Sequence, residues 1–359
     1  MNKRAKTAYP ATTKELIMPV PLFRPTLRRK DYNSVLNCLV TDQIAAGPLN
    51  REFAADLSRI LGVSGGVGLT SYRSCIRCAF DLLELKEGDG VILSALAPRE
   101  YLQMIESLGL VALIADVDPV STLLSVDSAK QQLSRGAKAI VLFYTLGSLP
   151  AGDELFDLGV PVIEDVSQAA GGFWEGKPCG ARGRAALLSL DSDGLITAGC
   201  GGAVFSTERR GLKALREIVE RDYGGELLAD MNAALGISQV RELPRFLQKR
   251  AEIAQVFHEA ALRSRHSPLL EEGTSVNFGF PILVREGRPE VRRYAEKRGI
   301  QTEPAFGEAV LSAEGSPPAA AGACPNAEQL LRRTVLFPLY PSLARKDIQL
   351  LCRVLSTLP

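Results

Sequence analysis

The feature that most constrains this chain is the alternation of short apolar runs with helix-length segments between residues 67 and 206. Runs such as GVILSA at 90–95 and KAIVLFY at 138–144 are separated by stretches whose apolar residues recur at helical spacing. Short buried strands that alternate with helices are typical of a largely parallel sheet covered on both faces. The sequence therefore predicts an α/β fold.

The pattern predicts two domains preceded by a polar arm. The predicted strands of the first domain are 67–70, 90–95, 111–117, 138–144, 161–166, 185–190 and 201–206. The predicted helices are 31–40, 47–63, 73–84, 99–108, 126–134, 207–222, 230–241 and 242–264, with a short segment at 152–157. Later elements are predicted at 276–284, 288–298 and 344–357, with a proline- and alanine-rich linker at 314–325. We expect a flexible arm at 1–18, a large domain at 19–250 with a mostly parallel, seven-stranded sheet sandwiched by helices, and a smaller C-terminal α/β domain at 251–359.

Composition excludes several classes of function. The 42 lysines and arginines nearly balance the 41 aspartates and glutamates, so no global field attracts nucleic acid or an anionic membrane. The apolar runs are too short to span a bilayer, and the first twenty residues lack a hydrophobic signal core, which predicts a cytoplasmic protein without a membrane partner. Seven scattered cysteines fit reduced thiols, and the Cys75–Cys78 pair has no second pair or nearby histidine, so no metal site is predicted.

Eight segments, taken in order along the chain, carry a resemblance to a known family. They are IAAGPLNREFAADLSRILGV, KEGDGVILSALAP, DVDP, GAKAIVLFYTLG, PVIEDVSQAAGGFWEGKPCGARGRAALLSL, GCGGAVFST, MNAALGISQVREL and CPNAEQLLRRTVLFPLYPSL. Together they resemble the pyridoxal-phosphate (PLP) enzymes of fold type I, and specifically the nucleotide-sugar aminotransferases of the DegT/DnrJ type. The resemblance covers nearly the whole chain after residue 18. It implies a PLP-transferase large domain, a homodimer whose sites are built across the interface, and a nucleotide-sugar ligand.

Three of the family's cofactor contacts are retained. The resemblance places Asp165 against the pyridine nitrogen of the cofactor, Gln168 against the ring hydroxyl and Ser189 against the phosphate. The residues alone also allow a structural interpretation. Asp165 would then cap the turn after its strand, Gln168 would begin the next helix, and Ser189 would only end a strand.

The reactive lysine of the family is missing, because its position corresponds to Gly194. Glycine has no amine with which to form a Schiff base. Some dehydratases of this fold carry a histidine there, but His258 and His266 lie in the later helical part of this chain. Lys177 is the nearest preceding lysine, and its counterpart in the family lies in a surface turn.

Further family contacts are replaced. The phosphate-binding segment reads Ser71-Tyr72-Arg73-Ser74-Cys75, with tyrosine where the family has a glycine that lets backbone N–H groups approach the phosphate. The positions of the stacking aromatic residue, of a glycine-flanked glutamate, and of an asparagine and an arginine correspond to Pro98, Cys200, Gly225 and Leu227. The lysine, the glycine, the stacking aromatic residue and the asparagine are chemically independent requirements of covalent PLP chemistry. All four are lost together, and we predict that no residue of this chain is catalytic.

The remaining polar groups suggest other ligands. Ser71, Arg73 and Ser74 stand at a predicted helix N-terminus and are candidates for binding an anion, with a solvated or salt-bridged arginine as the alternative. Asp191 and Asp193 have the wrong sign for a phosphate loop, which fits a loop that has lost its ligand.

Three hypotheses of function remain open. The first is a non-catalytic homologue that binds a nucleotide sugar, or that regulates or scaffolds a surface-polysaccharide pathway. The second is an active aminotransferase or dehydratase that uses PLP or pyridoxamine phosphate non-covalently with relocated catalytic groups. The third is a non-catalytic subunit paired with an active paralogue.

Overall fold

A computed structural model describes residues 19–312 and 323–359. The predicted arm at 1–18 and most of the linker at 314–325 lie outside the described residues. Within the described ranges no helix combines the length and the apolar character needed to cross a membrane.

The elements follow the predicted alternation. The α-helices are α1 (Arg29–Val40), α2 (Pro48–Leu61), α3 (Tyr72–Leu82), α4 (Arg99–Ser107), α5 (Val126–Leu133), α6 (Arg209–Asp222), α7 (Asp230–Ala261), α8 (Arg288–Glu296), α9 (Pro325–Arg333) and α10 (Arg345–Ser356). The strands are β1 (Gly65–Leu69), β2 (Gly90–Ser94), β3 (Val111–Ala115), β4 (Ala137–Phe143), β5 (Val162–Asp165), β6 (Phe173–Trp174), β7 (Lys177–Pro178), β8 (Ala185–Ser189), β9 (Gly202–Ser206), β10 (Ser267–Pro268), β11 (Phe280–Leu283), β12 (Glu303–Pro304) and β13 (Thr334–Phe337). Short 3₁₀ turns are η1 (Thr145–Gly147), η2 (Phe156–Leu158) and η3 (Gly224–Glu226).

The large sheet has seven strands in the order β1-β9-β8-β5-β4-β2-β3. The pairs β3–β2, β2–β4, β4–β5 and β5–β8 are parallel, whereas β9 runs antiparallel to both β8 and β1. The predicted α/β fold with a mostly parallel seven-stranded sheet is therefore confirmed. Such a sheet gathers the carboxyl ends of its parallel strands at one edge, where ligands usually bind.

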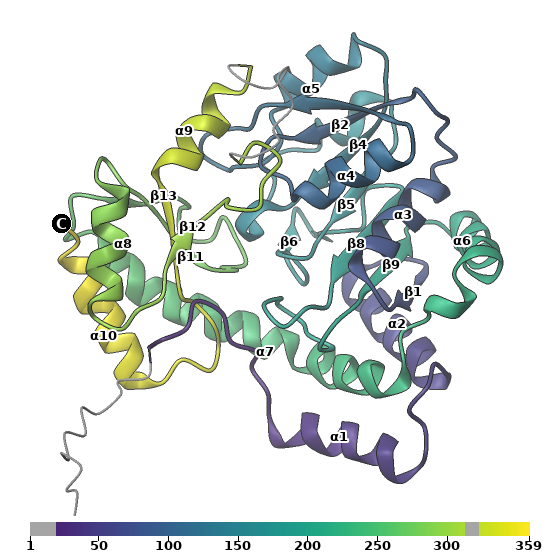
Figure 1. Ribbon diagram of the computed structural model, residues 1–359, viewed down its shortest axis with the longest axis horizontal. Coiled ribbons are helices and arrows are strands. Elements are labelled where there is room, and N and C mark those ends of the chain that lie inside the picture. The colour runs from purple at the N-terminus through teal and green to yellow at the C-terminus, as the bar shows by residue number, and fades with distance from the viewer. Residues whose placement is uncertain (1–18, 313–322) are drawn as a thin grey trace, which may run out of the picture.

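Helices cover both faces of this sheet (Figure 1). On one face α2, α5 and α7 pack against alternate strand residues, including Ile140 and Leu142. On the other face α3, α4 and α6 pack against the residues between them, including Val141 and Phe143. Adjacent strand residues point to opposite faces, so a strand buried on both sides reads as the continuous apolar run that the sequence shows.

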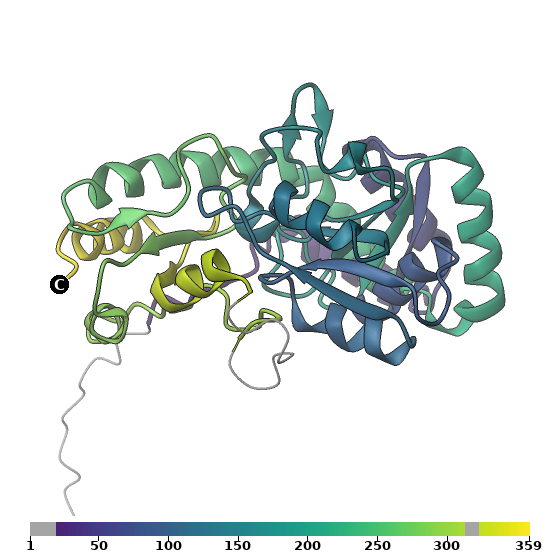
Figure 2. The same cartoon turned by 90° about the horizontal axis from the view of Figure 1, so that it is seen from above.

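A second, antiparallel sheet has the strand order β10-β11-β13-β12. The end of α7 packs with α8 and α10 around its core, and Figure 2 shows the two sheets side by side with α7 running along both. Arg250 of α7 donates to the carbonyls of Asn277, Phe278 and Leu339 at 3.0, 2.9 and 2.6 Å. Burial lowers the pKa of Arg250 to about 9, so the guanidinium is still charged at neutral pH.

The structure differs from two of the sequence expectations. The predicted helices 230–241 and 242–264 are one helix, α7, with Pro244 in its interior. Pro244 removes one backbone hydrogen bond, at a cost of about 3 kcal/mol, but the buried neighbours Val240 and Leu243 hold the helix against the large sheet. The helix α9 with the strand β13, and the β6–β7 hairpin, were not predicted. The expected domain boundary between residues 250 and 251 falls inside α7 and stays a prediction.

Glu164, in the middle of the large sheet, holds a loop through its carboxylate. Its side chain is fully buried. Oε1 accepts from the backbone N–H groups of Arg182 and Gly183 at 2.7 and 2.5 Å, and Oε2 accepts from that of Gly180 at 2.9 Å and from the Tyr144 hydroxyl. A buried carboxylate is tolerated when its acceptor positions are satisfied in this way.

We expect Glu164→Gln to lower the free energy of unfolding by about 3 kcal/mol. The substituted amide directs N–H donors at groups that are themselves donors, which leaves buried backbone N–H groups without an acceptor. Urea denaturation measures the change. Glu154→Gln, on an exposed carboxylate, is the control, and equal losses for the two variants would contradict the assigned role of Glu164.

Candidate functional site

The retained residues meet at the carboxyl edge of the large sheet. Asp165 ends β5, Ser189 ends β8, and Ser71 is the N-cap of α3, which accepts from the backbone N–H of Ser74 at 3.0 Å. Three segments that are far apart in the sequence thus converge at the edge where α/β sheets bind ligands.

Asp165 is fully buried, and four donors satisfy its carboxylate. Oδ2 accepts from the hydroxyl of Tyr101 at 2.6 Å and from that of Tyr72. Oδ1 accepts from the backbone N–H and the hydroxyl of Ser167 at 2.9 and 2.5 Å. A carboxylate offers about four acceptor positions, so this one has none left for the protonated nitrogen of a pyridine ring.

The two tyrosines fill the space beside Asp165. Their rings meet edge to face with centroids 6.3 Å apart and an interplanar angle of 89°. Burial raises the pKa of both Tyr72 and Tyr101 well above the ordinary value, so both hydroxyls stay protonated and donate. Comparison with the family's phosphate-binding segment singled out Tyr72. Tyr101 was missed, because a regular helical pattern at 99–108 does not separate a core tyrosine from one that reaches a site.

Gly194, where the resemblance places the family's lysine, lies in a closed turn. Its backbone N–H donates to the carbonyl of Asp191 at 3.2 Å. A Cβ added to Gly194 would lie 2.9 Å from the carbonyl oxygen of Ile196 and 3.3 Å from that of Asp191. Any side chain at this position would therefore require the loop backbone to move.

Ser189 and Gln168 both bind groups of the protein. The Ser189 hydroxyl donates to Asp191 Oδ2 at 2.6 Å. Gln168 Oε1 accepts from the backbone N–H of Leu146 at 2.6 Å, and Leu146 has a left-handed backbone with φ of 56°. Both contacts stabilise loops at the edge of the sheet. Burial raises the pKa of the neighbouring Asp193.

Of the three anion-binding candidates, the two serines contact other side chains of the protein, whereas Arg73 is exposed. The Ser74 hydroxyl, 2.7 Å from that of Ser71, donates to the carboxylate of Glu226. Arg73 is exposed and donates to Gln103 Oε1 at 3.3 Å, with no carboxylate in salt-bridge range in the described parts of the chain. Sequence reasoning missed Glu226, since no local pattern connects residues 74 and 226.

Arg73 faces an open polar pocket of about 920 Å³ between α3 and α6. Ser71, Ser74 and Arg77 also line it, and Arg77 lies one helical turn beyond Arg73. Neither of these two arginines forms a salt bridge with any described residue. Carboxylates line the pocket as well, and they are Asp81, Glu84, Asp222 and Glu226.

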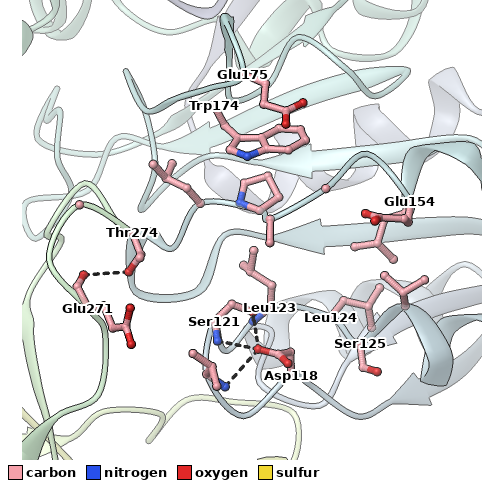
Figure 3. Close-up of a pocket in the computed structure, with 18 of the residues that line it drawn as sticks. Asp118, Ser121, Leu123, Leu124, Ser125, Glu154, Trp174, Glu175, Glu271 and Thr274 are labelled. Atoms are coloured by element: carbon pink, nitrogen blue, oxygen red, sulfur yellow. Dashed lines mark hydrogen bonds between the residues drawn. The ribbon is translucent and has the colours of Figure 1, made fainter.

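A second hollow, of about 800 Å³, lies beside the β6–β7 hairpin (Figure 3). Leu123, Leu124 and Trp174 contribute to its apolar lining. Its charged lining residues are Asp118, Asp127, Glu154, Glu175 and Glu271, and no lysine or arginine lines it. The potential of this hollow therefore disfavours a phosphate or diphosphate.

The other residues considered from the sequence lie elsewhere or are buried. Cys75 and Cys78 are buried on α3, and no group of three potential metal ligands occurs in residues 19–312 and 323–359. His258 packs against Phe280, and His266 Nε2 lies 2.8 Å from the Pro359 carbonyl oxygen, both beside the small sheet. Pro98 is the N-cap of α4, and Lys177 on β7 and Cys200 are exposed. Gly225 and Leu227 lie around the end of η3.

These residues do not fit PLP as the resemblance would place it. Asp165 has no free acceptor position, Tyr72 fills the space beside it, and Gly194 supplies neither an amine nor room for one.

Comparisons with known proteins agree on one family. The sequence profile of the DegT/DnrJ/EryC1/StrS aminotransferase family matches residues 25–356. The dTDP-4-dehydro-2,3,6-trideoxy-D-glucose 4-aminotransferase of Saccharopolyspora spinosa is 27% identical over 369 residues, which cover 92% of this chain and 94% of that protein.

Solved structures share the fold. The aminotransferase TlmJ of Streptoalloteichus hindustanus aligns with a TM-score of 0.84 at 23% identity, over 93% of this chain and 97% of that one. The sugar aminotransferase Spr1654 of Streptococcus pneumoniae aligns with a TM-score of 0.85 at 18% identity, over 95% and 97%. The GDP-4-keto-6-deoxy-D-mannose-3-dehydratase of E. coli aligns with a TM-score of 0.82 at 19% identity, over 93% and 98%.

The environment of Asp165 predicts a specific pH dependence of stability. Burial is the main influence on this group and raises its pKa above the ordinary value of 3.8. A raised pKa means that the folded state binds the proton more tightly, so the contribution of Asp165 is greatest below pH 3.8 and is lost as the pH rises through the folded-state pKa. We therefore expect the unfolding free energy of the wild type, minus that of Asp165→Asn, to fall with rising pH over this window.

Denaturant unfolding at a series of pH values measures this difference. Asp157→Asn, on an exposed carboxylate, is the control and should show no such decrease. A difference that rises with pH for Asp165→Asn would contradict the assignment.

Proposed function

Because the chain belongs to the DegT/DnrJ/EryC1/StrS aminotransferase family, we propose that it serves nucleotide-sugar metabolism as a non-catalytic protein that binds or regulates and does not transaminate. Membership of the family links it to nucleotide-sugar biosynthesis. The observation that carries the non-catalytic part of the proposal is the turn at Gly194, which has no amine and no space for a side chain. The saturated carboxylate of Asp165 supports the same proposal independently.

When PLP is added to the purified protein, we expect no aldimine absorbance band and no cofactor fixed by borohydride within the site, because Schiff-base formation needs an amine beside the ring. Peptide mapping after reduction distinguishes a site adduct from labelling of surface lysines. A family member that carries the lysine is the positive control. A reducible adduct on a lysine of the site, at the stoichiometry of the control, would support the active-enzyme hypothesis instead.

We also propose a nucleotide sugar as the ligand. The relatives named above include enzymes of dTDP- and GDP-linked sugars. Arg73 and Arg77, neighbouring and without carboxylate partners among the described residues, are suited to a diphosphate in the open pocket beside α3. Ser71 and Ser74, proposed with Arg73 from the sequence, contribute less to this proposal because they already contact each other and Glu226.

We expect a dTDP- or GDP-linked sugar to raise the melting temperature, because a ligand that binds only the native state stabilises it. The double variant Arg73→Ala/Arg77→Ala should weaken binding by about tenfold or more. Arg263→Ala, which removes an exposed arginine just after α7, is the control. If none of these sugars shifts the melting temperature, the nucleotide-sugar part is wrong and a partner-binding role is favoured.

A homodimer is proposed as the form in which the protein works. Exposed apolar side chains on α1 support an interface there, and they are Tyr32, Leu36, Leu39 and Val40. Pairing with an active paralogue is less well supported, because Gly225 and Leu227 replace the side chains that such a subunit would lend to its partner's site.

A further inference from the structure

We propose that Glu226 and Tyr72 are built-in substitutes for the phosphate and for the protonated ring nitrogen of PLP. The inference rests on the proposed function, and it adds that the chain itself provides the groups that the cofactor would otherwise bring. Two separate contacts at the start of α3 support it, one for each part of the cofactor.

The first contact places an anion at a helix N-terminus. The Glu226 carboxylate accepts from the hydroxyl of Ser74, which is the third residue of α3. Backbone N–H groups at a helix N-terminus attract negative charge, which is why phosphates bind there. Glu226 forms no salt bridge with any lysine or arginine in residues 19–312 and 323–359. The hydroxyl of Ser74, in the first turn of α3, is therefore the hydrogen-bond donor to this carboxylate among the described residues.

Backbone hydrogen bonds hold the segment around Glu226 beside β1. Thr70 N–H donates to the Glu226 carbonyl at 2.8 Å, and Leu228 N–H donates to the Gly68 carbonyl at 2.9 Å. Leu227 pairs with Leu69, so the residues after η3 add to the open edge of β1. Because β1 leads directly into the N-cap of α3, these bonds place the backbone of Glu226 beside the helix start.

The second contact concerns the ring. A protonated pyridine nitrogen donates one hydrogen bond to its carboxylate partner. Tyr72, the first residue of α3, donates from its hydroxyl to Asp165 Oδ2. The phenol of Tyr72 thus supplies an aromatic ring and a hydrogen-bond donor to Asp165, as the protonated pyridine ring would. A buried carboxylate needs such donors.

Both substitutes act on the first turn of one helix, so a cofactor would have to displace them together. Glu226 contacts Ser74, and Tyr72 itself lies in the same turn. Both contacts are made by the folded chain alone, without a bound ligand. The site is consequently complete without PLP, and removing Glu226 should create a vacancy for an anion.

We test the proposal with inorganic phosphate as the probe and Glu226→Ala as the variant. At matched ionic strength, phosphate should raise the melting temperature of Glu226→Ala by more than it raises that of the wild type. We expect the dissociation constant for phosphate to be at least about tenfold lower for the variant than for the wild type. Glu220→Ala removes an exposed carboxylate of α6 and should behave as the wild type.

A further variant locates the site. Adding Ser74→Ala to Glu226→Ala should abolish the phosphate effect, because the hydroxyl that binds the anion is gone. Equal phosphate responses of the wild type, Glu226→Ala and Glu220→Ala would overturn the proposal for Glu226. Since this assay contains no PLP, its failure is distinct from the appearance of a PLP adduct in the wild type, which would overturn the proposed function.

Glu226→Gln decides the question if the alanine variant does not fold. Glutamine keeps the size and the hydrogen-bond acceptor but removes the charge that the helix N-terminus stabilises. We expect Glu226→Gln to melt at a lower temperature than the wild type at low salt, with the difference shrinking as salt is added. Equal melting temperatures at every salt concentration would overturn the proposal.

For the ring part, Tyr72→Gly/Glu226→Ala should bind pyridoxamine phosphate at least about tenfold more tightly than Glu226→Ala alone, because the space beside Asp165 is then open. Equilibrium dialysis measures both affinities, and Tyr32→Gly in place of Tyr72→Gly controls for the loss of an exposed tyrosine. Equal affinities with and without Tyr72 would overturn this part.

Discussion

Two adjacent carboxylates at the end of β5 determine how the surrounding loops are arranged. Neighbouring strand residues point to opposite faces of a sheet, so Glu164 and Asp165 serve different sides. Glu164 accepts hydrogen bonds from backbone N–H groups of residues 180–183, whereas Asp165 accepts from tyrosine hydroxyls at the starts of α3 and α4. Burying charge is unfavourable unless donors surround it. Because both groups are fully buried, the segments that supply their donors cannot move independently of the sheet.

The framework around these carboxylates follows from local sequence patterns. Continuous apolar runs predicted all seven strands of the large sheet, because a strand buried on both faces is apolar throughout. Apolar residues at helical spacing predicted the helices that cover the sheet. Local patterns failed where packing overrode them. Pro244 favoured a helix boundary, but the burial of Val240 and Leu243 keeps α7 continuous. The proline-rich composition before residue 325 similarly concealed the start of α9, where Pro325 occupies the first turn that proline tolerates.

The site could be predicted only in part. Comparison with family motifs located Asp165, Ser189 and Gly194, because those positions lie in contiguous segments whose spacing is preserved. The contacts that decide the chemistry join residues separated by 64 and 152 positions, namely Tyr101 with Asp165 and Ser74 with Glu226. Neither Tyr101 nor Glu226 belongs to a recognisable local pattern. Only the folded chain, which brings β1, α3, α4 and η3 together, shows that side chains occupy the acceptors and donors a ligand would need.

The acidic residues near the site then have one electrostatic explanation. Two serines of the phosphate-type loops, Ser74 and Ser189, each donate to a carboxylate of the chain, Glu226 and Asp191 respectively. A phosphate placed about 4 Å from either carboxylate would meet a repulsion of about 4 kcal/mol per pair of unit charges at an effective dielectric constant of about 20. Carboxylates at these serines and a bound phosphate therefore disfavour each other. Under the proposed non-catalytic function the chain does not need the cofactor, so acidic side chains at both serines are compatible with the fold.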